Sequence, residues 1–170
     1  MTTRDECAGR LVRLQEKLRQ QDLDGALISH PIDLFYFTGT RQNGVLWTST
    51  NGDTQLMVRK SLSRARAEAL VDQVLPFPSS KAFAGSLPGT TSRIGMTFDV
   101  LTVQQYNYFA KLLPDSSFSD ISAINRDLRS IKSEQELAVM RAGGEKLCSV
   151  FAQVPEFLRA GMREVDLAAE

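Results

Sequence analysis

The dipeptide Asn51-Gly52 stands between two β-prone runs, Val45 to Thr50 and Asp53 to Arg59. Asparagine and glycine both tolerate the positive φ angles of a type I′ turn, so this pattern predicts an antiparallel hairpin. Elsewhere in the first 131 residues, strand signals alternate with helix signals. A hairpin beside strands that are separated by helices predicts a mixed sheet covered by helices, which is a three-layer α/β/α fold.

The other strands are expected at short apolar or alternating runs, and the helices at capping residues followed by apolar positions three and four apart. We predict strands over 25–29, 93–98 and 117–122, helices that begin after Thr3, Ser61 and Thr102, a helical turn at 32–37 and a short helix at 124–131. Leu75 to Pro78 is expected to end the helix that follows Ser61, because proline cannot continue a helix. The Ser-, Gly- and Pro-rich segment 79–91 is predicted to be irregular.

Ser133 and Glu136 form a capping box that predicts the start of a long helix. Apolar residues then recur three and four positions apart and share one helix face. Such a helix, starting after a complete α/β unit, has no obvious partner, so we divide the chain into a domain at 1–131 and a linker with the first helices of a second domain at 132–170. The exposed stripe predicts that the chain dimerises through this helix or packs it back on the sheet. The candidate interface residues are Leu137, Met140, Leu147 and Phe151.

Composition argues against several classes of function. The 170 residues include 20 Lys plus Arg and 20 Asp plus Glu, a net charge of zero that gives no support to nucleic-acid or anionic-membrane binding. The apolar runs are too short to span a bilayer, and the polar first ten residues do not resemble a secretory signal. Cys7 and Cys148 have no paired spacing and are expected to be reduced thiols. These features predict a soluble cytoplasmic protein.

The residues themselves suggest no catalytic apparatus. His30 is the one histidine of the sequence, and no paired His, Cys, Asp or Glu spacing predicts a metal site. A lone histidine at a strand end is more often structural than a ligand. Neither a phosphate-binding loop nor a nucleophile elbow is present. We therefore expect no catalytic residue, no metal and no cofactor in this chain.

The polar loop Thr40 to Gly44 follows an aromatic cluster, and Trp47 comes just after it. One interpretation is that Arg41, Phe37 and Trp47 form a rim that meets a ligand or a neighbouring subunit. The alternative is that the aromatic rings belong to the core, as large aromatics usually do, while Arg41 is solvated. The sequence leaves both interpretations open.

Two segments are similar to a known family. Leu23-Asp-Gly-Ala-Leu-Ile-Ser-His-Pro-Ile-Asp-Leu-Phe-Tyr-Phe-Thr-Gly39, with the helical segment before it, resembles the opening of the creatinase/prolidase N-terminal domain. Leu128-Arg-Ser-Ile-Lys-Ser-Glu-Gln-Glu-Leu-Ala-Val-Met-Arg141, together with the segment 161–170, resembles the junction into that family's catalytic domain. The resemblance implies a ribonuclease-H-like mixed sheet and a chain truncated just inside the catalytic domain.

The resemblance also implies a function for the parent protein. The family's C-terminal domain has a "pita-bread" fold with a dinuclear manganese, cobalt or zinc site, which in Xaa-Pro dipeptidases and aminopeptidases activates water to attack the bond before proline. Its ligands are expected beyond Glu170. The present chain is then a non-catalytic domain that supports a homodimer and narrows access to the active site. Alternatives are a creatinase-like amidinohydrolase, another C–N hydrolase of the same superfamily, or a non-catalytic binding module.

Overall fold

The computed structural model describes residues 3–169, which form two compact units that meet in sequence between Ile131 and Lys132. The first unit contains strands β1 (Gly25–Ile28), β2 (Gly44–Ser49), β3 (Thr54–Val58), β4 (Gln73–Pro76), β5 (Arg93–Met96) and β6 (Ser117–Asp120). Its helices are α1 (Arg4–Gln20), α2 (Pro31–Thr38), α3 (Leu62–Glu68), α4 (Phe83–Ser86), α5 (Val103–Leu112) and α6 (Ser122–Ser130). The second unit contains α7 (Glu134–Phe157) and α8 (Glu164–Leu167).

The six strands form one sheet in the order β4-β3-β2-β1-β5-β6. Strand β2 pairs antiparallel with both β1 and β3, whereas the β3–β4, β1–β5 and β5–β6 pairs are parallel. The sheet is therefore mixed, as predicted, and β2 is the one described strand that opposes the others. The five remaining strands all end at the same side of the sheet, which we call the carboxyl edge.

The predicted hairpin is present, but its turn is not of type I′. Thr48 pairs with Thr54, and the Ser49 N–H donates to the Asp53 carbonyl at 2.8 Å, so three residues form the loop. The Gly52 N–H donates to the Ser49 carbonyl at 3.2 Å, and of the two central residues Gly52 alone has a positive φ, 105°. This arrangement matches a three-residue hairpin loop in which glycine takes the left-handed position after a type I turn.

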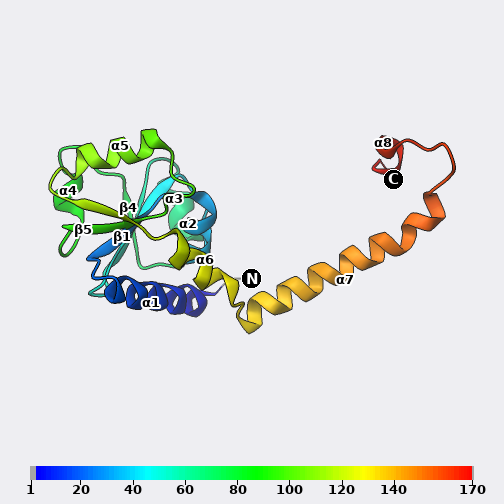
Figure 1. Cartoon of the computed structure of the whole chain (residues 1–170), viewed down its shortest axis with the longest axis horizontal. Coiled ribbons are helices and arrows are strands. Elements are labelled where there is room, and N and C mark those ends of the chain that lie inside the picture. Colours follow the sequence, from blue (N-terminus) through cyan, green and yellow to red (C-terminus); the bar gives the residue numbers. More distant parts are fainter. Residues whose placement is uncertain (1–2, 170) are drawn as a thin grey trace. The chain divides into compact units, whose positions relative to one another are not determined.

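Helices cover both faces of the sheet and enclose two apolar cores. Figure 1 shows α1 on one side of the strands and α5 on the other. The first core packs residues of α1, α2, α3 and α6 against the sheet, and the second packs residues of α4 and α5 against the opposite face. The alternation of buried positions along β1 shows this division, because Ala26 and Ile28 belong to the first core and Leu27 to the second. The predicted α/β/α fold is confirmed.

Strand β4 was not predicted from the sequence, which instead suggested a helix end at Leu75 to Pro78. Gln73 to Pro76 pair in parallel with Gln55 to Val58 at one border of the sheet. Proline is tolerated on such an edge strand because its missing N–H can face away from the ladder. The predicted cap at Ser61 is also wrong, since that residue has a φ of 56° and its side chain makes no capping hydrogen bond.

The second unit begins with the predicted capping box. The Glu136 N–H donates to Ser133 Oγ at 3.2 Å, and the Ser133 N–H donates to a Glu136 carboxylate oxygen at 2.8 Å. Helix α7 continues to Phe157, with Pro155 in its last turn, and contains no buried residue. Leu137 is half-buried, and the other three residues of the candidate interface are exposed, so their role in association stays a prediction. Among residues 3–169, no helix is long and apolar enough to cross a membrane.

Candidate functional site

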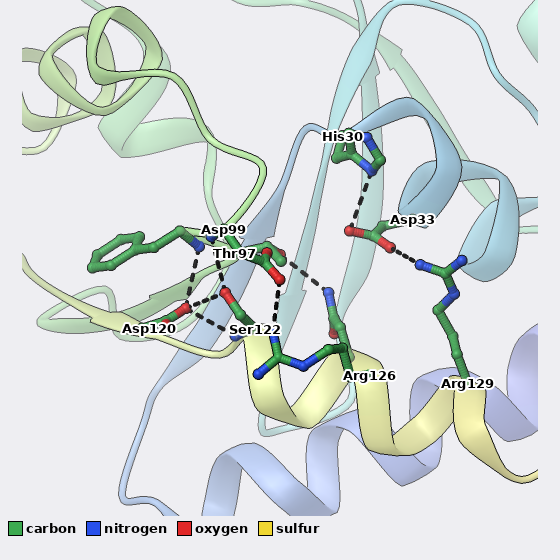
Figure 2. Close-up of polar contacts among 10 residues, drawn as sticks. His30, Asp33, Thr97, Asp99, Asp120, Ser122, Arg126 and Arg129 are labelled. Carbon is green, nitrogen blue, oxygen red and sulfur yellow. Dashed lines mark hydrogen bonds and ion pairs between the residues drawn. The ribbon is translucent and has the colours of Figure 1, made fainter.

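Polar side chains gather at the carboxyl edge, where β1, β5 and β6 end (Figure 2). They come from the segments just after β1 and β5, from the last residue of β6, and from helices α2 and α6. We call them the edge network: His30, Asp33, Thr97, Asp99, Asp120, Ser122, Asn125, Arg126 and Arg129. Parallel strands end together here, which explains why residues far apart in sequence meet.

Asp33 is the buried carboxylate of the edge network. Its Oδ2 lies 3.6 Å from His30 Nδ1, and Arg129 donates to its Oδ1 at 3.3 Å. Figure 2 shows the carboxylate between these two groups. Burial raises the pKa of Asp33 above its usual value, although the nearby His30 and Arg129 act in the opposite direction. The ionised carboxylate is therefore only partly compensated by its neighbours.

This geometry predicts an unusual pH dependence of stability. Because the folded pKa of Asp33 is raised, the folded state holds more protons than the unfolded state, and the free energy of unfolding falls as the pH rises from the unfolded pKa of about 3.9 through the folded value. Replacement of Asp33 by asparagine should remove this loss. We expect the stability of Asp33→Asn relative to wild type to increase between about pH 4 and pH 7, as measured by urea denaturation.

A matched control is Asp127→Asn, which changes an exposed carboxylate on α6, the helix that carries Arg129. That variant should follow the wild-type pH profile. If Asp33→Asn instead loses stability relative to wild type as the pH rises, attraction by Arg129 outweighs the cost of burial, and our interpretation of Asp33 is wrong.

The rest of the edge network joins strand ends to helix α6. Burial pushes the pKa of Asp120 upward, but hydrogen bonds from the Ser122 hydroxyl and N–H and from the Phe98 N–H outweigh it and lower the pKa. Arg126 donates to Asp99 at 2.8 Å, and the Asn125 amide donates to the Thr97 hydroxyl at 3.1 Å. These contacts fix the start of α6 against β5 and β6, so their evident role is structural.

Among the residues that the structure describes, the edge network contains neither a metal site nor a nucleophile paired with a base. In residues 3–169, no group of three or more His, Cys, Asp or Glu side chains is placed to hold a metal ion. His30 approaches a carboxylate rather than a hydroxyl or thiol that it could activate. Cys7 is buried, and burial raises the pKa of its thiol, which opposes formation of a nucleophilic thiolate.

The loop Thr40 to Gly44 is anchored by Glu68 of α3. The Glu68 carboxylate accepts hydrogen bonds from Thr40 Oγ1 at 2.7 Å and from Gln42 Nε2 at 3.2 Å, and it pairs with Arg64 Nε at 2.6 Å. The bond from Thr40, followed by those from Arg64 and Gln42, lowers the pKa of Glu68 to about 2. Arg41 stands between the two anchored residues with its side chain exposed.

The two aromatic residues of the predicted rim lie elsewhere. Phe37 and Trp47 are both fully buried, so the prediction that their rings line a surface rim is wrong, and the core interpretation holds. Phe37 packs in the first core with its ring edge-on to Tyr36 at 4.9 Å between centroids. Trp47 lies in the second core, and its Nε1 donates to the Pro88 carbonyl at 3.0 Å. Only Arg41 remains available as a rim residue.

The roles of Glu68 and Arg129 were not predicted from the sequence. The spacing of Arg64 and Glu68 indicates a helical ion pair, but it does not reveal that Glu68 also faces a loop 26 to 28 residues away. Arg129 meets Asp33 across 96 positions, and no local pattern connects them. The topology of the sheet alone brings these pairs together.

The mixed sheet with helices on both faces defines a class of α/β domain that is shared with solved peptidase structures. A structure of an Xaa-Pro dipeptidase from Bacillus anthracis superposes with a TM-score of 0.84 at 19% identity, covering 96% of this chain and 47% of that one. The N-terminal domain of the cytoplasmic peptidase PepQ from Mycobacterium tuberculosis H37Rv gives a TM-score of 0.60 at 22% identity, covering 71% of this chain and 98% of that one.

Residues 10–131 match the family described as the Creatinase/Prolidase N-terminal domain. The chain therefore belongs to that family. An uncharacterized peptidase of Staphylococcus aureus (strain USA300) is 22% identical over 164 residues, which cover 93% of this chain and 47% of the relative. This chain thus spans about half the length of the curated relatives that it matches.

Proposed function

We propose that this chain is the non-catalytic N-terminal domain of a metal-dependent Xaa-Pro dipeptidase or aminopeptidase, whose parent protein hydrolyses the peptide bond before proline. The observation that carries the proposal is the family match over residues 10–131. Similarity of nearly the whole chain to about half of a structure named Xaa-Pro dipeptidase supports it. The edge network, a set of mutually paired groups, is consistent with a domain that does no chemistry of its own.

The proposal assigns a dinuclear manganese, cobalt or zinc centre to the parent protein. Carboxylate and imidazole groups must converge to hold such metals. The residues described here do not fit the centre, because none of their His, Cys, Asp and Glu side chains form a group of three or more around a possible metal position. The proposal therefore places the ligands in another part of the parent protein.

Within this proposal, the loop Thr40 to Gly44 narrows access to the active site and Arg41 is its contact residue. Both chain neighbours of Arg41 are bonded to Glu68, so the loop backbone that carries Arg41 is already ordered and less entropy is lost when a ligand binds. A guanidinium can donate two parallel hydrogen bonds to a carboxylate, a group that every dipeptide carries. Arg41 would contribute to substrate affinity more than to the chemical step.

We further propose a cytoplasmic homodimer. The exposed apolar residues Met140, Leu147 and Phe151, with the half-buried Leu137, support association through one face of α7. The name of a structural neighbour, a cytoplasmic peptidase, supports the location.

Steady-state kinetics test both parts of this proposal, the peptidase activity and the role of Arg41. The protein is expressed from its complete reading frame. With manganese, cobalt or zinc supplied, the wild type should cleave Xaa-Pro dipeptides. Arg41→Ala should raise KM by about tenfold or more with a smaller change in kcat, because a hydrogen bond to a charged group is lost. Arg13→Ala, which removes another exposed arginine from α1, should leave both parameters unchanged.

The outcomes separate the two parts of the proposal. If no Xaa-Pro dipeptide is cleaved with any of the three metals, the peptidase assignment is wrong. If the wild type is active and Arg41→Ala matches it for several dipeptides, the assignment stands and the role of Arg41 as a rim residue does not.

A further inference from the structure

A polar groove of about 340 Å³ opens at the carboxyl edge, between the end of β1, the start of β2 and helix α5. Strand β1 leads into α2 on the face of the first core, whereas β5 leads into α5 on the face of the second core. Adjacent parallel strands whose connections leave in opposite directions create a switch point, where α/β proteins commonly bind ligands. The groove lies beside this point, where helix α5 approaches the end of β1 and the start of β2.

Arg59 is the cationic group of the groove, and aromatic rings hold it. Its Cζ lies 3.7 Å from the centroid of the Phe77 ring and 5.2 Å from that of Tyr108. The Arg59 N–H also donates to the Asn43 carbonyl at 2.8 Å, which fixes the backbone at the groove wall. A guanidinium over a ring face keeps its N–H groups free at its edge.

No carboxylate neutralises this arginine within the part of the chain that the structure describes. Six other arginines form ion pairs with acids: Arg4, Arg10, Arg64, Arg126, Arg129 and Arg163. Arg59 has none among residues 3–169, and no acidic residue lines the groove. A positioned guanidinium without a counter-ion is therefore available to an external anion.

The start of α5 adds donors on the opposite wall. Thr102 and Gln105 form a capping box, in which the side-chain Oε1 of Gln105 accepts from the Thr102 N–H at 3.0 Å. The side-chain Nε2 of Gln105 therefore remains a donor. Gln104 and Gln105 both line the groove, and the helix N-terminus favours negative charge. Val45, Tyr108 and Phe109 supply an apolar wall. The lining thus combines one cation, neutral amide groups and apolar surface.

We propose that this groove binds a small organic carboxylate, with Arg59 on the carboxylate and the amides of Gln104 and Gln105 on a neighbouring polar group of the ligand. The volume suits a molecule of amino-acid to dipeptide size. An apolar wall and neutral amides favour an organic acid over inorganic phosphate. The inference does not depend on the proposed peptidase function, since it concerns only groups within residues 29–109.

Nuclear magnetic resonance of the ¹⁵N-labelled 170-residue chain tests this site. The probe ligand is N-acetylalanine. The control ligand is N-acetylalaninamide, which lacks the charged carboxylate, and sodium chloride keeps the ionic strength constant. The acid should give saturable shifts of the Arg59 Nε–H and of the Gln104 and Gln105 side-chain amides, with a dissociation constant on the order of 1 mM. The amide should give none.

Substitutions of Arg59 test whether this residue binds the carboxylate. Arg59→Gln should weaken binding by about tenfold or more, while Arg13→Gln should bind as wild type. Arg59→Lys keeps the charge but loses the two-pronged donor geometry, so it should bind with intermediate affinity and serves if Arg59→Gln fails to fold. The proposal is wrong if the acid gives no saturable shifts, if Arg59 variants bind as wild type, or if inorganic phosphate binds more tightly than the organic acid.

Discussion

Replacement of Trp47 by alanine should lower the free energy of unfolding by about 3–5 kcal/mol, the range found when large aromatic side chains are removed from protein cores. The side chain is fully buried in the second core and is the one tryptophan of the sequence. Its loss leaves a large cavity between the sheet and helices α4 and α5. Because whole domains are stable by only about 5–15 kcal/mol, the variant should lie close to the limit of folding.

Urea denaturation followed by circular dichroism measures this effect, since tryptophan fluorescence is absent from the variant. Phe35→Ala is the matched control, because Phe35 lies on α2 in the same domain with 44% of its surface exposed, and its removal should cost less than about 1 kcal/mol. Similar small losses for both variants would show that Trp47 is a surface residue, as the rim interpretation required, and would contradict the packing described above.

The sequence predicted those features of the fold that depend on local patterns. Asn51-Gly52 between two β-prone runs predicted the hairpin, and two Ser or Thr residues three positions before Glu or Gln predicted the capping boxes of α5 and α7. The predicted type of turn was wrong because the strand register places Thr48 opposite Thr54 and Ser49 opposite Asp53, which leaves three residues in the loop. Register depends on packing of the sheet faces, and a dipeptide does not specify it.

Features that depend on distant partners were not predicted. Gln73 to Pro76 form a strand because β3 offers a free edge, although the local sequence with its two prolines suggested only a helix end. Phe37 on α2 and Trp47 on β2 could be assigned to the core only from the packing of these two elements in the folded domain. The contact of Glu68 with the loop Thr40 to Gly44 and the contact of Phe77 with Arg59 both join separate elements. Single-sequence patterns carry no information on such pairs.

Replacement of Gly25 by alanine should lower the free energy of unfolding by about 2–3 kcal/mol, because the added methyl group overpacks the core. A Cβ atom at this position would lie 2.5 Å from Cη2 and 2.8 Å from Cζ2 of Trp47, and 2.6 Å from the Thr48 carbonyl oxygen. Gly25 begins the central strand β1, which is paired on both sides, so neither strand can move away easily. Gly85→Ala, where no atom lies within 4 Å of the new methyl group, should change stability by less than about 0.5 kcal/mol.

A double-mutant cycle with Trp47→Phe separates the two sources of this cost. Phenylalanine lacks Cζ2 and Cη2, so the methyl group of Gly25→Ala should cost about 1 kcal/mol less in the Trp47→Phe background than in wild type, measured by urea denaturation. The remaining cost belongs to the contact with the Thr48 carbonyl, which both backgrounds share. If the losses in free energy of unfolding from the two substitutions simply add, the whole cost of Gly25→Ala comes from the contact with the Thr48 carbonyl. That result would contradict the inference that the indole ring requires glycine at position 25.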